Sequence, residues 1–505
     1  MVPTLLKRIS LIVGLSALGV TVAIGLLRAP DVQSAYARSI APVALGASAA
    51  YPNCRFGMGA GGPVDYNVAA LNLGWYLDWH TTITPTHPSQ TDYVQVVRVQ
   101  TAIDGFTFSP PTATLQAAVF ANPGATWLIG NEPDSPMQDN MVPELYARAY
   151  HHLYGLIKSY DPTARIGAGG IVQPTPLRFQ YLDRVLAAYR ANYSQTLPAD
   201  LWNTHSYILR EITSDDPDAI DNGGSLEVWG AYVPPGINAT RGKLYSYSQM
   251  FDVGIFRQRL IDFRQWLARN GYRDVPLLIT EYGTLFPYPP YIDGDPYVDE
   301  NGVPMTEART ATFMLDTFDI LRTLVDPNIG YRADGGRLVQ RWSWYSSDDI
   351  NYGGILFYTN THALNPLGQA FAAYTTQQPP AVDLNVVADS SAAPWAGQPV
   401  PFMLKATVGN QGNISVSVPF TVTFYDGPPG TGVPIGQAQI PRGLSGCGGA
   451  ATVSMTWTVS SPGLHEFYVE VDSTHSIIET DENNNLAIGW ALVSTHQVYL
   501  PALFR

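Results

Sequence analysis

Two short segments, in which a run of apolar residues ends at a glutamate, constrain this chain most. They are Trp127-Leu-Ile-Gly-Asn-Glu-Pro-Asp134 and Pro276-Leu-Leu-Ile-Thr-Glu-Tyr-Gly283. A short apolar run predicts a buried strand, and each glutamate stands where such a strand stops. Side chains at the carboxyl ends of parallel strands in a barrel face one pocket, so Glu132 and Glu281 are expected to meet. Either segment alone is a weak signal, but the pair within a strand–helix repeat is specific.

Two carboxyl groups facing one pocket are what hydrolysis of a glycosidic bond requires. One group protonates the leaving oxygen, while the other attacks the sugar or activates a water molecule. We therefore interpret Glu132 and Glu281 as candidate catalytic residues. Asn131 carries both a donor and an acceptor, which suit a sugar hydroxyl. The alternatives are a salt-bridged loop glutamate for Glu132 and a turn asparagine for Asn131.

The region from residue 51 to residue 377 alternates apolar runs with helical segments. Candidate strands lie at 55–59, 74–79, 93–99, 127–130, 165–169, 201–207, 277–280 and 338–344. Helices are predicted between them at 144–160, 177–193, 250–270 and 306–324. This α/β repeat predicts a closed (β/α)8 TIM barrel, with a doubly wound open sheet as the alternative. Two long loops, 210–247 and 284–304, are expected to wall its cleft.

Three motifs in this region resemble those of a known group of enzymes. Gly74-Trp-Tyr-Leu-Asp-Trp79, Gly130-Asn-Glu-Pro-Asp134 and Ile279-Thr-Glu-Tyr282 are similar to motifs of glycoside hydrolase family 128, in clan A of the retaining glycosidases. The resemblance spans residues 54–375 and is close only in the motifs. It implies a general acid/base after strand four (Glu132), a nucleophile after strand seven (Glu281) and β-1,3-glucan as substrate class.

The resemblance also suggests a role for the end of the sixth strand, His205-Ser206-Tyr207. Enzymes of the clan often place a tyrosine there that bonds the nucleophile and keeps it ionised. Tyr207 is the candidate for this role, and His205 is expected to line the cleft. Simple packing of either side chain is the alternative.

Further substrate-binding candidates lie near the ends of the second and eighth strands. Trp342 and Trp344 alternate along the eighth strand and therefore face the same side. Trp344, nearer the strand end, is expected to form the floor on which a sugar ring stacks, as is common in the clan. Asp78 and Trp79 are candidate subsite residues. A role in the core is the alternative for the tryptophans.

The sequence pattern changes near residues 377–380. Short alternating strands follow at 383–387, 400–408, 420–425, 452–458 and 465–471, and predict a small all-β sandwich. Asp383-Leu-Asn-Val386, Val408-Gly-Asn-Gln-Gly-Asn413 and Ile478-Glu-Thr-Asp-Glu-Asn-Asn-Asn485 resemble the immunoglobulin-like CARDB domain. This resemblance implies a spacer, adhesion or ligand-presenting role without catalysis.

The predicted organisation therefore has six parts. They are a signal peptide or N-terminal anchor (1–37), a spacer (38–50), a catalytic TIM barrel (51–377), a linker (378–382), a CARDB-like sandwich (383–493) and a tail (494–505). The Pro-Pro sequence at the junction is expected to mark a boundary crossed by few contacts. The sandwich is accordingly expected to be dispensable for chemistry.

The first residues predict export. Lys7 and Arg8 precede an apolar stretch at 9–27, followed by the small-x-small sequence Ala35-Tyr36-Ala37. The stretch suits either a cleaved signal or a retained membrane anchor. Both place the protein outside the cytoplasm, in the medium or at the cell surface. A disulfide between Cys54 and Cys447 is possible there, although two buried or free thiols are the favoured expectation.

Composition excludes some partners. A formal net charge of -14 does not suit nucleic acid or an anionic membrane surface, which both require a basic protein. No cofactor or metal is expected, because cysteines with metal-ligand spacing are absent. The acidic segments 293–301 and 479–485 have some character of calcium loops, but the spacing of the first does not match an EF-hand and solvated turns are preferred for both.

The leading interpretation is an exported retaining glycoside hydrolase that cleaves β-glycosidic bonds in a polysaccharide by double displacement. An inverting enzyme that activates water is the mechanistic variant. A non-catalytic surface protein that binds carbohydrate or mediates adhesion is the main alternative, and an anchored envelope scaffold is a third. The presence of both glutamates disfavours the non-catalytic readings.

Overall fold

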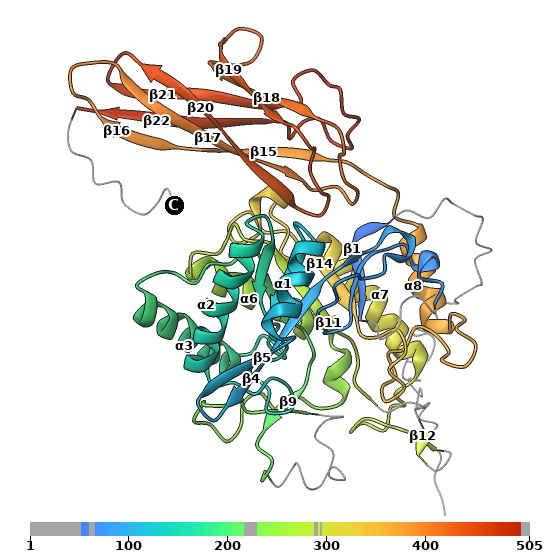
Figure 1. Cartoon of the computed structure of the whole chain (residues 1–505). Helices are drawn as coiled ribbons and strands as arrows, with labels where there is room; N and C mark the ends of the chain where they lie inside the picture. The colour runs from blue at the N-terminus through green and yellow to red at the C-terminus, as the bar shows by residue number, and fades with distance from the viewer. Residues whose placement is uncertain (1–51, 60–65, 217–229, 287–290, 293–294, 496–505) are drawn as a thin grey trace, which may run out of the picture. The chain divides into compact units, whose positions relative to one another are not determined.

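The computed structural model describes residues 52–59, 66–216, 230–286, 291–292 and 295–495. A mixed α/β domain extends to α8 (Pro366–Thr376), and an all-β domain begins at β15 (Leu384–Asp389) (Figure 1). The predicted signal or anchor, the spacer and the tail from residue 496 onward lie outside the described residues. Within the described ranges, none of the helices has the length and apolar character needed to span a bilayer.

The α/β domain contains two sheets of mainly parallel strands. The first has the order β3-β2-β1-β14-β11-β8 and is parallel throughout, with β1 (Asn53–Gly59), β2 (Leu73–Leu77), β3 (Asp92–Tyr93), β8 (Trp202–His205), β11 (Leu277–Tyr282) and β14 (Arg341–Trp344). The second has the order β5-β4-β6-β7, with β4 (Gln95–Ala102), β5 (Gly105–Ser109), β6 (Thr126–Ile129) and β7 (Arg165–Ala168). Only β4 and β5 pair antiparallel in it. Each predicted strand overlaps an observed one, and the third is divided into β3 and β4 at Val94.

The two sheets are connected along both sides. The chain passes from β3 to β4 through a single residue, and isolated parallel bridges join Gly167 to Leu201 and Ile171 to Thr204. One buried cluster consists only of residues in or beside the strands of both sheets: Trp75, Leu77, Val94, Val96, Leu128, Leu201 and Leu278. The strands therefore share an inner core, and the predicted mixed α/β character is confirmed.

Helices cover the strands on their outer side. They are α1 (Thr112–Ala121), α2 (Pro143–Tyr160), α3 (Pro176–Tyr193), α6 (Val253–Arg269), α7 (Glu307–Thr323) and α8. Figure 1 shows α2 and α3 on one side of the strands and α7 and α8 on the other. Asp252 caps α6 by accepting from the N–H groups of Gly254 and Ile255, and Thr306 caps α7. The predicted helices correspond to α2, α3, α6 and α7, whereas α1 and α8 were not predicted.

The long segments after β8 and β11 contain short strands of their own. After β8, β9 (Arg210–Ile212) pairs parallel with β10 (Gly230–Tyr232). After β11, β12 (Tyr291–Ile292) pairs antiparallel with β13 (Asp295–Pro296). The first of these pairs contributes to the site described below.

The all-β domain consists of two sheets around a core of its own. One has the order β15-β17-β20, with β17 (Val400–Asn410) and β20 (Gly449–Val459). The other has the order β16-β22-β21-β18-β19, with β16 (Ser391–Pro394), β18 (Phe420–Asp426), β19 (Val433–Ile440), β21 (Gly463–Val471) and β22 (Leu486–Ser494). Alternate residues such as Leu404, Ala406 and Val408 in β17 point into that core. The predicted all-β character is confirmed, but β16, β19 and β22 were not predicted.

The two domains are joined by more than the chain between them, and both belong to one compact unit. Cys54 in β1 forms a disulfide with Cys447, which corrects the expectation of two unpaired thiols. Beside it, the Arg55 guanidinium pairs with Asp334 at 2.8 Å and donates to the carbonyl oxygen of Gln411, also at 2.8 Å. The expectation of a junction crossed by few contacts is therefore wrong. A Pro-Pro sequence marks the linker but does not show that the start of β1 lies against the all-β domain.

Candidate active site

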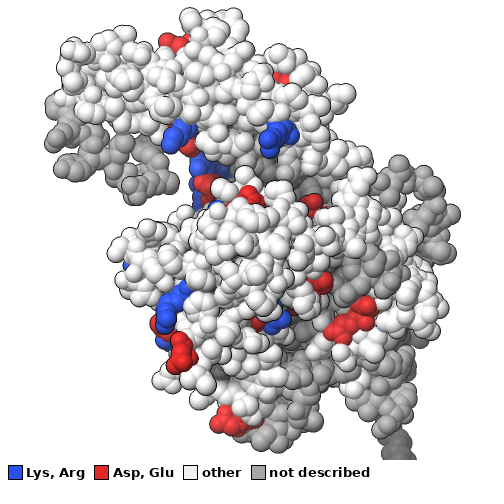
Figure 2. Space-filling view, in the orientation of Figure 1, with Lys and Arg blue, Asp and Glu red and all other residues white. Residues whose placement is uncertain are grey.

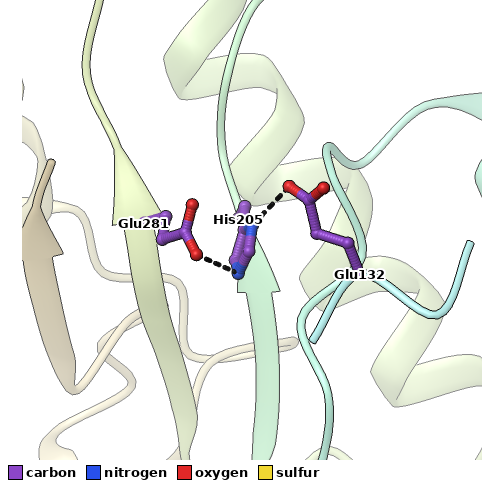
Figure 3. A group of neighbouring side chains, drawn as sticks. All are labelled: Glu132, His205 and Glu281. Atoms are coloured by element: carbon purple, nitrogen blue, oxygen red, sulfur yellow. Dashed lines mark hydrogen bonds and ion pairs between the residues drawn. The ribbon is translucent and has the colours of Figure 1, made fainter. Parts of the chain in front are cut away.

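The two predicted glutamates lie together at the carboxyl ends of their strands. Glu281 is near the end of β11, Glu132 follows β6, and His205 ends β8. Figure 3 shows the imidazole of His205 between the two carboxylates. Its Nδ1 lies 2.9 Å from Glu132 Oε1 and its Nε2 lies 3.4 Å from Glu281 Oε1. A carboxylate oxygen of each glutamate and a ring nitrogen all lie within 4.8 Å of one another.

Both glutamates line a cleft with a volume of about 310 Å³. Its other lining residues come from the loop after Glu132 (Ser135, Met137, Gln138), from Val172, from Tyr207, Leu209 and β10, and from the segments after β11 and β14 (Leu285, Tyr345, Tyr352). The long segment after β8 therefore does wall the cleft, as expected. The lining combines tyrosines and amide or carboxylate groups, which is a surface suited to a neutral polar ligand.

The surroundings of Glu281 control its charge. Tyr207 donates its hydroxyl hydrogen bond to Oε2 at 3.0 Å, which is the contact expected from the sequence, and the Trp79 indole donates to Oε1 at 2.5 Å. Burial raises the pKa of Glu281 above its usual value, and the negative charge of Glu132 raises it further. The positive charge of His205 and the two hydrogen bonds act in the opposite direction. These three side chains therefore favour the ionised form that a nucleophile needs.

His205 is completely buried. Burial alone lowers the pKa of a histidine, but the charge of Glu281 and the hydrogen bond and charge of Glu132 raise the pKa of His205 above its ordinary value. This favours the imidazolium, whose two N–H groups face the two carboxylates. The three side chains lie in a row, with the positive imidazolium of His205 between the acidic groups of Glu132 and Glu281.

The same three side chains also carry atoms that can bind a metal ion. Among the described residues, Glu132, His205 and Glu281 are the one group of His, Cys, Asp or Glu donor atoms close enough together to share an ion. A metal ligand must be a neutral imidazole, whereas the raised pKa of His205 favours the charged ring. The row therefore suits a hydrogen-bonded triad better than a metal. The described part of the acidic segment 293–301 and the turn 479–485 form no such group, and residues 293 and 294 lie outside the described residues.

Buried contacts hold the loop that carries Glu132. Glu132 itself has a left-handed backbone with φ of 45°, and its N–H donates to the carbonyl of Gly170 at 2.9 Å. The buried carboxylate of Asp139 accepts from the N–H of Asn131 at 2.8 Å and pairs with Arg98. The side chain of Asn131, predicted to bond the sugar, does not line the cleft, and the residue is only 6% exposed.

The two candidates at the end of the second strand, Asp78 and Trp79, have different contacts. Trp79 contacts Glu281 and its ring centroid lies 5.8 Å from that of Tyr345, which lines the cleft. Asp78 accepts instead from the hydroxyl of Tyr93 and from the N–H of His80. Asp78 is therefore engaged with its own strand neighbours and does not line the cleft.

Trp344, the predicted stacking floor, has no exposed surface. Its indole donates to the carbonyl of Gly354 at 2.8 Å, and its ring packs edge-on against Tyr282 with centroids 5.2 Å apart. Trp342 is equally buried in the outer cluster that includes the helices. The two tryptophans do share one face of the strand, as the alternation predicted, but that face is turned toward the helices. The next residue, Tyr345, lines the cleft. Trp344 thus offers no face to a sugar ring.

Charge is sparse on the molecular surface seen in Figure 2. Lys and Arg, like Asp and Glu, appear there as small separate groups. Over the residues that the structure describes, that face shows no continuous basic area.

The comparisons with known proteins address the two domains separately. The CARDB family model matches residues 380–488, so this part of the chain is a CARDB domain, as its motifs indicated. No curated protein matches the sequence.

Solved structures similar to this one include enzymes of glycoside hydrolase family 128. A subgroup II endo-β-1,3-glucanase from Sorangium cellulosum has 17% identity and a TM-score of 0.39, over 63% of this chain and 98% of that chain. A subgroup II endo-β-1,3-glucanase from Pseudomonas viridiflava has 15% identity and a TM-score of 0.40, over 64% and 98% of the chains. A subgroup I enzyme from Amycolatopsis mediterranei, in complex with laminaritriose, has 19% identity and a TM-score of 0.38, over 63% and 99%. These likenesses are distant.

Proposed function

We propose that this protein is an exported retaining glycoside hydrolase that cleaves β-glycosidic bonds in a polysaccharide. The observation that carries the proposal is the closeness of Glu132 and Glu281, which have oxygen atoms within 4.8 Å of each other and line one cleft. Retaining glycosidases hold their two carboxyl groups ~5–5.5 Å apart, whereas inverting enzymes need ~6.5–9.5 Å to admit a water molecule. The 4.8 Å bound applies to single oxygen atoms and not to whole carboxyl groups, and this closeness favours the shorter spacing, which allows direct attack by a glutamate.

In the first step, a carboxylate oxygen of Glu281 forms a bond to the anomeric carbon as the bond to the leaving oxygen breaks. Glu132 gives its proton to that oxygen, so the leaving sugar departs as a neutral alcohol. Trp79 and Tyr207 each hold one oxygen of Glu281 and thereby orient the nucleophile. His205 lies between the two glutamates, and its positive charge offsets the negative charge of the Glu281 nucleophile.

In the second step, Glu132 acts as the base. Its carboxylate takes a proton from a water molecule, whose oxygen attacks the anomeric carbon and releases Glu281. The carbon is inverted twice, so the product keeps the configuration of the substrate.

We also infer that the α/β domain is a (β/α)8 barrel. Three observations support a closed ring of strands in the order β1, β2, β3 with β4, β6, β7, β8, β11 and β14. They are the direct passage from β3 to β4, the parallel bridges at Gly167 and Ile171, and the inner cluster shared by both sheets. A barrel of this kind carries its chemistry at the carboxyl ends of the strands, where Glu132, His205 and Glu281 stand.

The motif resemblance to family 128 favours β-1,3-glucan as the substrate. Export is supported by Lys7, Arg8 and the apolar stretch at 9–27. It is also supported by the disulfide between Cys54 and Cys447, because disulfides persist in oxidising compartments.

The test is to incubate the purified protein with an array of polysaccharides that includes linear β-1,3-glucan. New reducing ends should appear with the wild type and not with Glu281→Gln, and added EDTA should not change the rate. NMR of the first-formed product should show the β anomer. An α anomer would exclude the double displacement, and binding without turnover on every polysaccharide would favour the non-catalytic alternative.

A further inference from the structure

The wholly buried side chain of Arg178, in the first turn of α3, contacts three segments around the cleft. Its Nη1 pairs with the carboxylate of Asp134 and donates to the carbonyl of the same residue at 3.2 Å. Its Nε donates to Glu211 Oε1 at 2.9 Å, and its Nη2 donates to the carbonyl of Tyr232 at 2.8 Å. One guanidinium thus joins the loop of Glu132, β9 and β10.

The partners of Arg178 are themselves anchored. The carboxylate of Asp134 accepts from the N–H of Val172 at 3.3 Å. Glu211 accepts from the hydroxyl of Thr175 at 2.6 Å and from the N–H of Lys243 at 2.9 Å. The contacts to Asp134 and Glu211 therefore connect Arg178 to segments that have few alternative positions.

Two of these segments carry residues that line the cleft. Asp134 lies two residues after Glu132 and directly before Ser135, and both of these neighbours line the cleft. Tyr232 lines it from β10. The distance between the Glu132 loop and β10 therefore depends on the guanidinium that bonds the backbone of both.

We propose that Arg178 is a positioning residue that fixes the part of the cleft in which the leaving-group sugars bind. This inference rests on the proposed function. Because Glu132 protonates the leaving oxygen, the sugar attached to that oxygen must lie beside Glu132. Three residues line the cleft there and lie on segments that Arg178 holds or adjoins. They are Ser135 and Gln138 from the Glu132 loop and Tyr232 from β10.

Lysine in place of Arg178 keeps the charge but not the geometry. The ammonium group of lysine stands on a flexible stem. It cannot donate hydrogen bonds to three partners in the fixed geometry of a planar guanidinium. The charge still balances Asp134 and Glu211, which reduces the penalty of leaving buried carboxylates unpaired. Arg178→Lys is therefore the variant that loosens the cleft with the least damage to the fold.

The experiment compares two substrates of the same sugar and linkage. One is a linear β-1,3-linked gluco-oligosaccharide, and the other is its dinitrophenyl glycoside, which needs no proton from Glu132 and places no sugar beside it. For Arg178→Lys, kcat/KM on the oligosaccharide should fall about 10- to 100-fold, since a misplacement of about 1 Å has effects of that size. On the dinitrophenyl glycoside, kcat/KM of Arg178→Lys should stay within about threefold of the wild-type value.

Arg184→Lys provides the matched control. Arg184 lies on the same helix and pairs with Glu144 at 2.7 Å, with both side chains largely exposed. Exposed pairs contribute little, so both substrates should react as with the wild type.

Equal losses on the two substrates, or no loss on either, would overturn the role assigned to Arg178. Where Arg178→Lys proves unfolded by its thermal transition, Glu211→Gln removes the charge of one partner and should show the same difference between the substrates. A wild type inactive on both substrates would instead overturn the proposed function.

Discussion

The two ends of the parallel strands in the α/β domain use buried charge differently. At the carboxyl ends, Glu132 and Glu281 lie close together with His205 between them, and a cleft opens beside the group. At the amino ends, Arg55 of β1 is paired with Asp334, and its remaining donors bond backbone oxygens. The first arrangement keeps two like charges near each other, which destabilises the folded state and produces reactive groups. In the second arrangement, the charge of Arg55 is paired with the opposite charge of Asp334.

This difference indicates where substitutions should change rate and where they should change stability. In the proposed reaction, residues at the carboxyl ends act on the charge that develops. Residues at the amino ends hold the all-β domain and the strands together.

The largest effect is expected for Glu281→Ala. The variant has no nucleophile, so kcat should fall about 10,000-fold or more on every substrate. Azide should restore reaction and give a product of the opposite anomeric configuration. Steady-state kinetics and NMR of the product measure this, with Glu144→Ala, an exposed glutamate of α2, as the matched control. A loss below tenfold would remove Glu281 from the mechanism.

Glu132→Ala should lower turnover about 100- to 10,000-fold, to an extent that depends on the leaving group. Substrates with activated leaving groups need no proton, so their first step should survive. The glycosyl-enzyme should then accumulate, because the same residue must later activate water. Rapid-quench kinetics and mass spectrometry of the intact protein detect both results. If Glu132→Ala and Glu281→Ala behaved alike across leaving groups of different pKa, the assignment of roles would be wrong.

Tyr207→Phe should change turnover by less than about tenfold but alter its pH dependence. The lost hydrogen bond lowers the pKa of Glu281 in the wild type, so the pKa should rise in the variant. The nucleophile must be ionised, and the acid limb of kcat/KM should therefore move to higher pH. Tyr345→Phe is the control, because its hydroxyl bonds Asp349 instead. A shift of the limb to lower pH would contradict the assigned contact.

At the opposite end, replacing Cys54 and Cys447 together by Ser should leave kcat within about twofold while lowering the free energy of unfolding by about 2–5 kcal/mol. The two cysteines are distant in sequence from the residues that line the cleft, and neither of them lines it. Denaturant unfolding of the variant beside the oxidised and the reduced wild type measures the change. A folded variant with a tenfold lower kcat would show that the amino ends take part in the reaction.

The sequence predicted most of the framework because apolar periodicity is local. It located the glutamates, since strand ends can be read from where an apolar run stops, whereas Tyr207 was suggested by the resemblance to the clan. It misplaced Trp344 because alternation shows which residues share a face but not which face looks inward. It missed Arg178, because nothing near a helix residue indicates which loops from other parts of the chain will surround it. The disulfide was missed for the same reason, as 393 residues separate its cysteines.

The disulfide has a mechanical consequence for a protein held by its two termini. Tension that enters before Cys54 and leaves after Cys447 passes through the sulfur–sulfur bond and bypasses the chain between them. Glu132, Glu281, and the helices and most of the strands that the structure describes lie in the bypassed loop. Shear on an attached molecule would load the segments outside that loop, which include β20, β21 and β22, and the cleft would keep its shape under force.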